Sequence, residues 1–181
     1  MAECVIVLAL LLVRMDAFAQ SQQPDVSLEY AVKATYLYKL APFVNWPPGT
    51  FSSPDAPFEI CVLGHDPFDD FLAKAIKGRK LGTHPFKVRK LDAVVHSSDC
   101  QIVFIGYADA NEVREALHTF DGEPVLTVTD SNDPDNSGSV VQFVMDEGHV
   151  RFDVDEAAAQ RNHLEISSKL LDLAMTVKGA G

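Results

Sequence analysis

Two short stretches of the sequence are apolar along nearly their whole length, and they limit the fold more than any other feature. Residues 58–64 have the sequence FEICVLG, and residues 100–107 have the sequence CQIVFIGY. A strand that is apolar on both faces has to be covered on both faces, as in the parallel sheets that helices flank. The chain is therefore expected to contain a sheet with a layer packed against each side.

The segments around these strands alternate between helix and strand patterns. Residues 26–46 form a wide apolar stripe at helical spacing, and Pro42 is expected to kink that helix. A second helix pattern begins at Asp66, the expected N-cap, and ends at Gly78. The remaining strand patterns cover residues 85–91, 124–130, 139–146 and 149–155, and the remaining helix patterns cover residues 109–120 and 156–175.

The order of these elements predicts the architecture. Strand, helix, strand, helix and strand in succession predict an α/β fold: a layered single domain with a largely parallel sheet and helices on both faces. Glu147-Gly148 separates two alternating runs, which predicts a hairpin in the C-terminal half. The terminal helical segment is expected to be broken near Asn162-His163.

The first residues have the pattern of a secretory signal peptide. Residues 4–13 are a ten-residue apolar run, too short to span a bilayer, and Ala17 and Ala19 form an A-x-A cleavage pattern. The front of the chain departs from the pattern, because it carries Glu3 and no basic residue; a buried N-terminal helix is the alternative. We expect a signal peptide at residues 1–19, a domain at residues 20–181, and a periplasmic location without membrane insertion after cleavage.

The charge of the chain excludes some partners. The sequence has 26 acidic and 15 basic residues, a formal net charge of −11. Nucleic-acid binding depends on a basic face that displaces counterions from phosphates, and docking on anionic lipid headgroups also depends on basic residues. We therefore expect no nucleic-acid partner.

The motifs of the common enzyme classes are missing from the sequence. It has no G-x-G-x-x-G, Walker or G-x-S-x-G motif, and none of its six histidines has a partner at zinc-ligand spacing. His65 and Asp66, at the carboxyl end of the first apolar strand, are the best candidates for acid–base chemistry or ligand binding. The alternative is that Asp66 only caps a helix and His65 is a loop residue.

An acidic loop partly matches a calcium-binding pattern. Asp133, Asp135, Ser137 and Gly138 match positions 1, 3, 5 and 6 of an EF-hand loop, but Val144 stands where position 12 requires a glutamate. Aspartate, asparagine, proline and glycine are also ordinary turn residues, and we favour that explanation. No catalytic residue, metal or cofactor is predicted.

Two cysteines remain after the signal peptide, Cys61 and Cys100. An even number suits an oxidising compartment, and a bond between them would close a loop of about forty residues, worth roughly 4 kcal/mol. The alternative is two buried thiols that pack as small apolar groups. The absence of a C-x-x-C motif disfavours a thioredoxin-type oxidoreductase.

The C-terminal segment LEISSKLLDLA is rich in leucine and isoleucine. Leu164, Ile166 and Leu170 are the candidates for a surface that docks a partner. The alternative, which we favour, is that these side chains pack on the sheet, because exposed apolar patches are uncommon.

Several segments together resemble the YfiR-like proteins over nearly the whole chain after the signal peptide. The resemblance is carried by KATYLYKLAPFVNWP, FEICVLGHDPF, DCQIVFIG, PVLTVTD and VRFDVDEAAAQRNHLEISSKLLDLA, in this order. Each motif alone is weak, whereas their combination is specific. The sequence departs from the family at Pro42, a position that is usually polar or charged, and at FDVD, where Phe-Glu-Ile-Asn is more usual.

The resemblance implies a small α/β periplasmic protein without catalytic activity. Such a protein binds the periplasmic sensor domain of an inner-membrane diguanylate cyclase and represses it, which lowers cyclic-di-GMP and restrains biofilm formation. The resemblance also implies self-association and a response to redox state or envelope stress. Cys61 and Cys100 match the family's cysteines and are candidates for a redox-sensitive disulfide, while a second cysteine pair found near the hairpin in some members is missing here.

Two other functions remain open from the residues. One is a periplasmic small-ligand binding protein or hydrolase that uses the His65/Asp66 loop and the aromatic residues of the first helix. The other is a structural component of the envelope without a signalling role.

Overall fold

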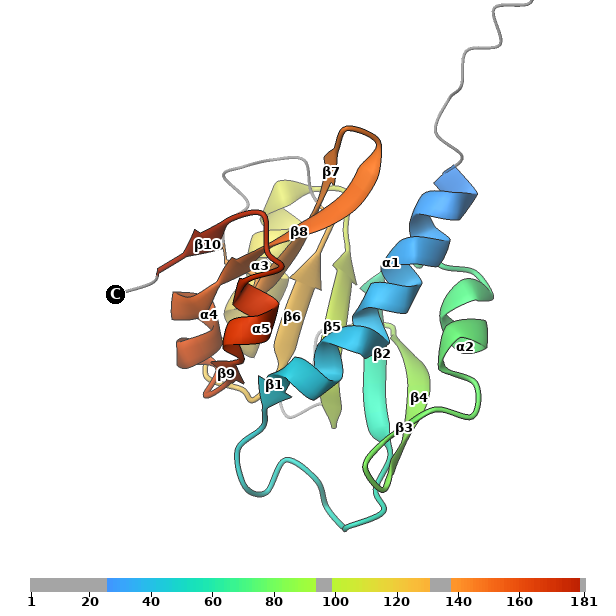
Figure 1. Ribbon diagram of the computed structural model, residues 1–181, viewed down its shortest axis with the longest axis vertical. Helices are drawn as coiled ribbons and strands as arrows, with labels where there is room; N and C mark the ends of the chain where they lie inside the picture. Colours follow the sequence, from blue (N-terminus) through green and yellow to red (C-terminus); the bar gives the residue numbers. More distant parts are fainter. Residues whose placement is uncertain (1–25, 94–98, 131–137, 180–181) are drawn as a thin grey trace, which may run out of the picture.

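An eight-stranded sheet runs through the chain in the computed structural model, which describes residues 26–93, 99–130 and 138–179 (Figure 1). Its strand order is β10-β8-β7-β6-β5-β2-β4-β3. The strands are β2 Phe58–Gly64, β3 Lys80–Leu81, β4 His84–Leu91, β5 Cys100–Gly106, β6 Leu126–Thr129, β7 Val141–Asp146, β8 His149–Asp155 and β10 Val177–Lys178. The predicted signal peptide at residues 1–19 and the acidic-loop residues Asp133, Asp135 and Ser137 lie outside the described residues.

The sheet is largely parallel, as predicted. Strands β4, β2, β5, β6 and β7 run parallel to one another, and β10 runs parallel to β8. The exceptions are β3, antiparallel to β4, and the β7–β8 hairpin. In that hairpin Asp146 pairs with His149, and the intervening Glu147 and Gly148 have φ angles of 48° and 78°. Two positive φ angles are what a two-residue type I′ turn requires.

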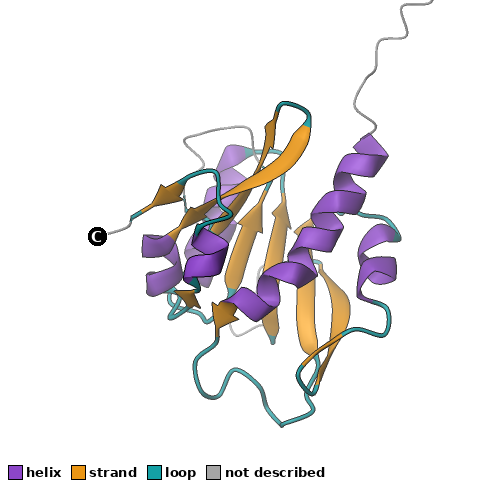
Figure 2. Ribbon diagram, in the orientation of Figure 1, coloured by secondary structure: helices purple, strands orange, loops and turns teal. Residues whose placement is uncertain are grey.

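Helices cover both faces of the sheet, which confirms the predicted α/β architecture (Figure 2). The helices are α1 Val26–Leu40, α2 Phe71–Ile76, α3 Ala110–Phe120, α4 Glu156–Arg161 and α5 Ser168–Leu171, with a 3₁₀ turn η2 at Ala41–Phe43. Alternate side chains of a strand point to opposite faces. Accordingly Ile60 and Val62 of β2 join the core under α1 and α2, whereas Cys61 and Leu63 join the core under α3.

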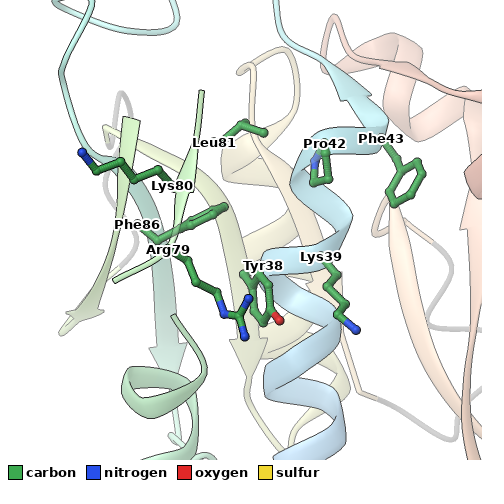
Figure 3. Close-up of a pocket in the computed structure, with 8 residues that line it drawn as sticks. All are labelled: Tyr38, Lys39, Pro42, Phe43, Arg79, Lys80, Leu81 and Phe86. Atoms are coloured by element: carbon green, nitrogen blue, oxygen red, sulfur yellow. The ribbon is translucent and has the colours of Figure 1, made fainter. Parts of the chain in front are cut away.

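The first helix ends earlier than the sequence pattern indicates. It stops at Leu40 instead of continuing with a kink to Trp46, and Figure 3 shows Pro42 and Phe43 in the turn that follows. Residues Val44–Asn45 then form strand β1, antiparallel to β9 at Glu165–Ile166. Proline lacks the N–H that a continuing helix would need, and a strand from the far end of the chain pairs with the residues beyond it.

The capping predictions had two outcomes. Asp109 caps α3 as predicted, because its carboxylate accepts hydrogen bonds from the backbone N–H groups of Asn111 and Glu112. The prediction that Asp66 caps α2 is wrong. That helix begins five residues later, at Phe71, and Asp66 Oδ1 accepts a hydrogen bond from Phe68 N at 3.0 Å in a local turn.

Candidate functional site

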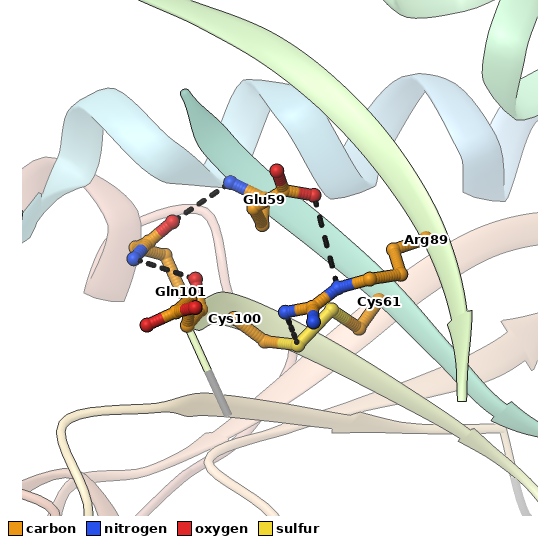
Figure 4. Close-up of a disulfide and its surroundings, with 6 residues drawn as sticks. Glu59, Cys61, Arg89, Cys100 and Gln101 are labelled. Atoms are coloured by element: carbon orange, nitrogen blue, oxygen red, sulfur yellow. Dashed lines mark hydrogen bonds and ion pairs between the residues drawn. A yellow bond between two sulfur atoms is a disulfide. The ribbon is translucent and has the colours of Figure 1, made fainter. Parts of the chain in front are cut away.

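The structure joins Cys61 of β2 to Cys100 of β5 in a disulfide, with Cα atoms 5.9 Å apart (Figure 4). The two strands are neighbours, but their register shifts by one residue here: Glu59 pairs with Cys100 and Ile60 pairs with Ile102. Gln101 is the extra residue of this β-bulge. As a result, Cys100 faces the α3 core together with Cys61, whereas Ile102 faces the core on the α1 side. Without the bulge, strict alternation would place Cys100 and Ile102 on the same face.

The side chain of Gln101 supplies the hydrogen bonds that the bulge interrupts. Its Oε1 accepts a hydrogen bond from Glu59 N at 2.7 Å, and its Nε2 donates one to the carbonyl of Asp99 at 3.0 Å. Gln101 is buried, so an amide without these partners would be costly there. The bulge beside the disulfide is therefore held in place by a satisfied polar side chain.

A cation lies against one of the two sulfur atoms. Arg89 of β4 donates a hydrogen bond from Nη2 to Cys100 Sγ at 3.3 Å, and its Nε lies 4.0 Å from Glu59 Oε2 (Figure 4). A neighbouring guanidinium stabilises a thiolate, so Cys100 is the sulfur better suited to leave when the bond is reduced. Both cysteines are buried, so a reductant needs local opening of the structure to reach them.

The candidate residues His65 and Asp66 do not interact with each other in the structure. Asp66 makes an ion pair with Lys90 at 2.8 Å and accepts the backbone N–H of Phe68, and no hydrogen bond within the described part of the chain joins it to the exposed His65. The hydrogen bond to Asp66 raises the pKa of Lys90. His65 does line a hollow of about 250 Å³ at the carboxyl ends of β2 and β5, but Asp66 is not part of its lining.

A buried lysine that the sequence reasoning missed lies at the same edge of the sheet. Lys33 of α1 is 1% exposed and contacts Glu29 and, at 2.7 Å, Asp130 Oδ1 at the end of β6. The spacing of Glu29 and Lys33 was the available signal, since residues four apart on a helix are neighbours. Burial and the nearby Asp130 carboxylate raise the pKa of Tyr30 well above its ordinary range. This charge cluster attaches α1 to the sheet.

Two of the three candidates for a partner surface are buried in the structure. Leu164 and Leu170 are 1% and 2% exposed and belong to the core on the α1 side of the sheet, where the packing alternative placed them. Ile166 is half-buried in β9 and pairs with Val44 of β1. The short elements of the C-terminal segment fold back on the sheet, so Leu164 and Leu170 are used for packing, whereas Leu173 stays 61% exposed.

An exposed apolar groove lies elsewhere, between α1 and the β7–β8 hairpin. It has a volume of about 500 Å³, and Leu28, Val32 and Met145 along it are 65%, 36% and 37% exposed. Large apolar side chains gathered in this way commonly mark an interaction surface. The sequence did not indicate it, because Leu28 and Val32 belong to the same helical stripe as residues that are buried.

Among residues 26–93, 99–130 and 138–179, no cluster of His, Cys, Asp or Glu has the arrangement of a metal site. In the same ranges, no helix has the length and apolar character needed to cross a membrane.

Comparison with known proteins gives a family. A model of the YfiR/HmsC-like family matches residues 30–175, a range that contains β2, β5, the disulfide and the Lys33–Asp130 ion pair. No curated protein matches the chain at a significant level. Because the family model covers most of the sequence, the chain belongs to the YfiR/HmsC-like family.

Proposed function

We propose that this protein is a non-enzymatic periplasmic regulator that binds the periplasmic sensor domain of an inner-membrane diguanylate cyclase and represses it. Membership of the YfiR/HmsC-like family carries the proposal. The signal-peptide pattern of residues 1–19 supports a periplasmic location. Asp66 is engaged by Lys90 and by the backbone N–H of Phe68, which argues against the competing hydrolase hypothesis.

The Cys61–Cys100 disulfide is the proposed redox-sensitive element. It links β2 and β5, two adjacent strands of the central sheet, and lies in the core beneath α3. Its reduction would remove a covalent link between these strands, and Arg89 would stabilise the thiolate form of Cys100. A change of periplasmic redox state would in this way change the free energy of unfolding of the regulator. Repression of the cyclase would change as a consequence.

The groove that contains Leu28, Val32 and Met145 is the proposed surface for the cyclase sensor domain. Its exposed apolar side chains would gain free energy from burial in a complex. The groove lies between α1 and the β7–β8 hairpin, on the side of α1 away from α2 (Figure 1). Self-association, which the family resemblance implies, stays a prediction.

The proposal is tested by measuring cyclic-di-GMP in a strain that lacks the gene. We expect a rise in cyclic-di-GMP and in surface attachment, and a return to the parental level when the full-length gene is restored. A gene that encodes only residues 20–181 should leave the level high, because its product stays in the cytoplasm. Unchanged cyclic-di-GMP in the deletion strain, with and without envelope stress, would refute the regulatory function.

The surface is tested by paired charge substitutions in the restored gene. Leu28→Glu should abolish repression while the protein accumulates normally, because a carboxylate in the groove prevents apolar docking. Leu173→Glu is the matched control: Leu173 is 61% exposed, close to the 65% of Leu28, and lies in the C-terminal segment away from the groove. Loss of repression with Leu173→Glu alone would place the docking surface on that segment.

A further inference from the structure

A pocket with a volume of about 470 Å³ lies between the end of α1 and the β3–β4 hairpin (Figure 3). This is within the range of small-molecule sites in proteins. The pocket is lined by Tyr38, Lys39, Pro42, Phe43, Arg79, Lys80, Leu81 and Phe86. The set combines apolar and aromatic side chains with three basic ones and contains no acidic residue.

The apolar part of the pocket is formed by side chains that the core holds in place. The rings of Tyr38 and Phe86 meet edge to face with centroids 6.0 Å apart, and Phe86 meets the buried Phe58 in the same way at 5.0 Å. Phe43 and Leu81 are half-buried and pack against the same core. A ligand therefore finds walls that are largely preformed, which lowers the entropic cost of binding.

The cations at the pocket are unusual for an acidic chain. Lys39, Arg79 and Lys80 are exposed, and within the described ranges none of them forms an ion pair. The sequence nevertheless has 26 acidic residues against 15 basic ones, so carboxylates are in excess. Three cations without an ion-pair partner therefore line one pocket of a protein with a net charge of −11, and such a grouping favours an anionic ligand.

Arg79 is placed to bind the charged end of a ligand. Its guanidinium carbon lies 4.7 Å from the centroid of the Tyr38 ring, and its Nε donates a hydrogen bond to the carbonyl of Ala75 at 2.8 Å. These two contacts orient the guanidinium and leave its terminal Nη groups open to a ligand. Figure 3 shows Arg79 beside Tyr38, with Lys39 and Lys80 extending from opposite sides of the pocket.

From this geometry we propose that the pocket binds a small amphipathic organic anion: a single carboxylate on an aliphatic or aromatic body. The carboxylate contacts the Nη groups of Arg79, and the body packs on Tyr38, Phe86 and Leu81. A bare inorganic anion would leave the apolar side chains of the pocket exposed to water. A neutral apolar molecule would leave the cations without a partner. The proposal concerns a property of the chain itself and does not depend on the repression of a cyclase.

The experiment uses three probes with the same eight-carbon tail and different heads: octanoate, octan-1-ol and octylammonium. Binding to the purified protein is measured by calorimetry at low salt. We expect octanoate to bind at least about tenfold more tightly than octan-1-ol, no measurable binding of octylammonium, and weaker octanoate binding as salt is raised.

Variants of the basic side chains test the role of Arg79. Arg79→Glu should weaken octanoate binding at least about tenfold, and Arg79→Lys, which keeps the charge and loses the two-pronged contact, should weaken it less. Lys87→Glu makes the same charge change on β4, next to Phe86 in sequence and outside the pocket lining, and should leave the affinity within about twofold. Circular dichroism checks that each variant is folded.

Three results would overturn the proposal. They are equal binding of the three probes, octanoate binding that Arg79→Glu and Lys87→Glu change to the same extent, and binding to anionic phospholipid vesicles without binding of free octanoate. The last result would assign the cations to a membrane surface.

Discussion

Loss of the Cys61–Cys100 disulfide is expected to lower the free energy of unfolding by about 4 kcal/mol. The two cysteines are 39 residues apart in the sequence. For a closed loop of about 40 residues, the restriction of the unfolded chain gives roughly 4 kcal/mol at 25 °C. The free energy of unfolding of a typical domain is about 5–15 kcal/mol in total, so the bond provides a large part of the stability.

Reduction is a cleaner perturbation than substitution. The reduced protein keeps both sulfur atoms in the core beneath α3, whereas Cys61→Ala/Cys100→Ala also leaves small cavities there, which cost about 1 kcal/mol or more in addition. Urea unfolding of the oxidised protein, the reduced protein and the double variant separates the two contributions. The fluorescence of Trp46, the one tryptophan of the sequence, reports on the fold, because its ring packs against Phe58 of β2 at 5.4 Å.

The free energy of unfolding of a small domain falls by about 2 kcal/mol per molar urea. A loss of about 4 kcal/mol in the free energy of unfolding therefore lowers the urea midpoint by about 2 M. The double variant should respond to neither oxidant nor reductant, which controls for effects of the reagent. Oxidised and reduced protein with midpoints within about 0.5 M of each other would refute the reasoning. The bond would then contribute little to folding, and a redox response through stability would lose its basis.

Three other predictions concern the charged and polar side chains. Burial and Asp130 raise the pKa of Tyr30 above its ordinary value of 10.0. As pH rises above 10, the Tyr30 hydroxyl therefore loses its proton in the unfolded chain before it does so in the folded protein, and the free energy of unfolding should fall. Urea midpoints between pH 8 and pH 11 should fall less in Tyr30→Phe; an equal fall would contradict the shift. Asp130→Asn should lower the free energy of unfolding by about 2 kcal/mol, because Lys33 stays buried with one charged partner fewer, and a urea midpoint equal to that of the unchanged protein would contradict this. Arg89→Gln should lower the reduction potential of the disulfide by about 30 mV in a glutathione titration, because the reduced form loses a stabilising cation, whereas Lys87→Gln on the same strand should not.

The fold class follows from patterns that the sequence carries locally. Strands β2 and β5 are apolar on both faces, which requires covering layers wherever in the fold they lie. Helix α3 begins where Asp109 provides a cap, and the β7–β8 hairpin turns where Glu147-Gly148 accepts positive φ angles. Each of these features depends on residues within a few positions of one another, so the sequence alone was enough to predict them.

The sites depend on residues that are far apart in the chain. Helix α1 ends at Leu40 where the sequence pattern continued to Trp46, and the residues beyond its last turn pair with β9, about 120 positions away. Lys33 is buried because Asp130 reaches it from the end of β6. Gln101 is accommodated in a bulge where its side-chain oxygen accepts a hydrogen bond from the backbone N–H of Glu59, 42 positions earlier in the sequence.

The position of Arg79 is the clearest case of the same kind. In the sequence it is one basic residue after a helix-ending glycine, and nothing nearby marks it as different from the other lysines and arginines. Packing of α1 against the β3–β4 hairpin brings it to Tyr38 and makes an apolar pocket beside it. Local propensity determined the secondary-structure elements of this protein, and their packing decided which charges are buried, which are paired and which remain available for a ligand.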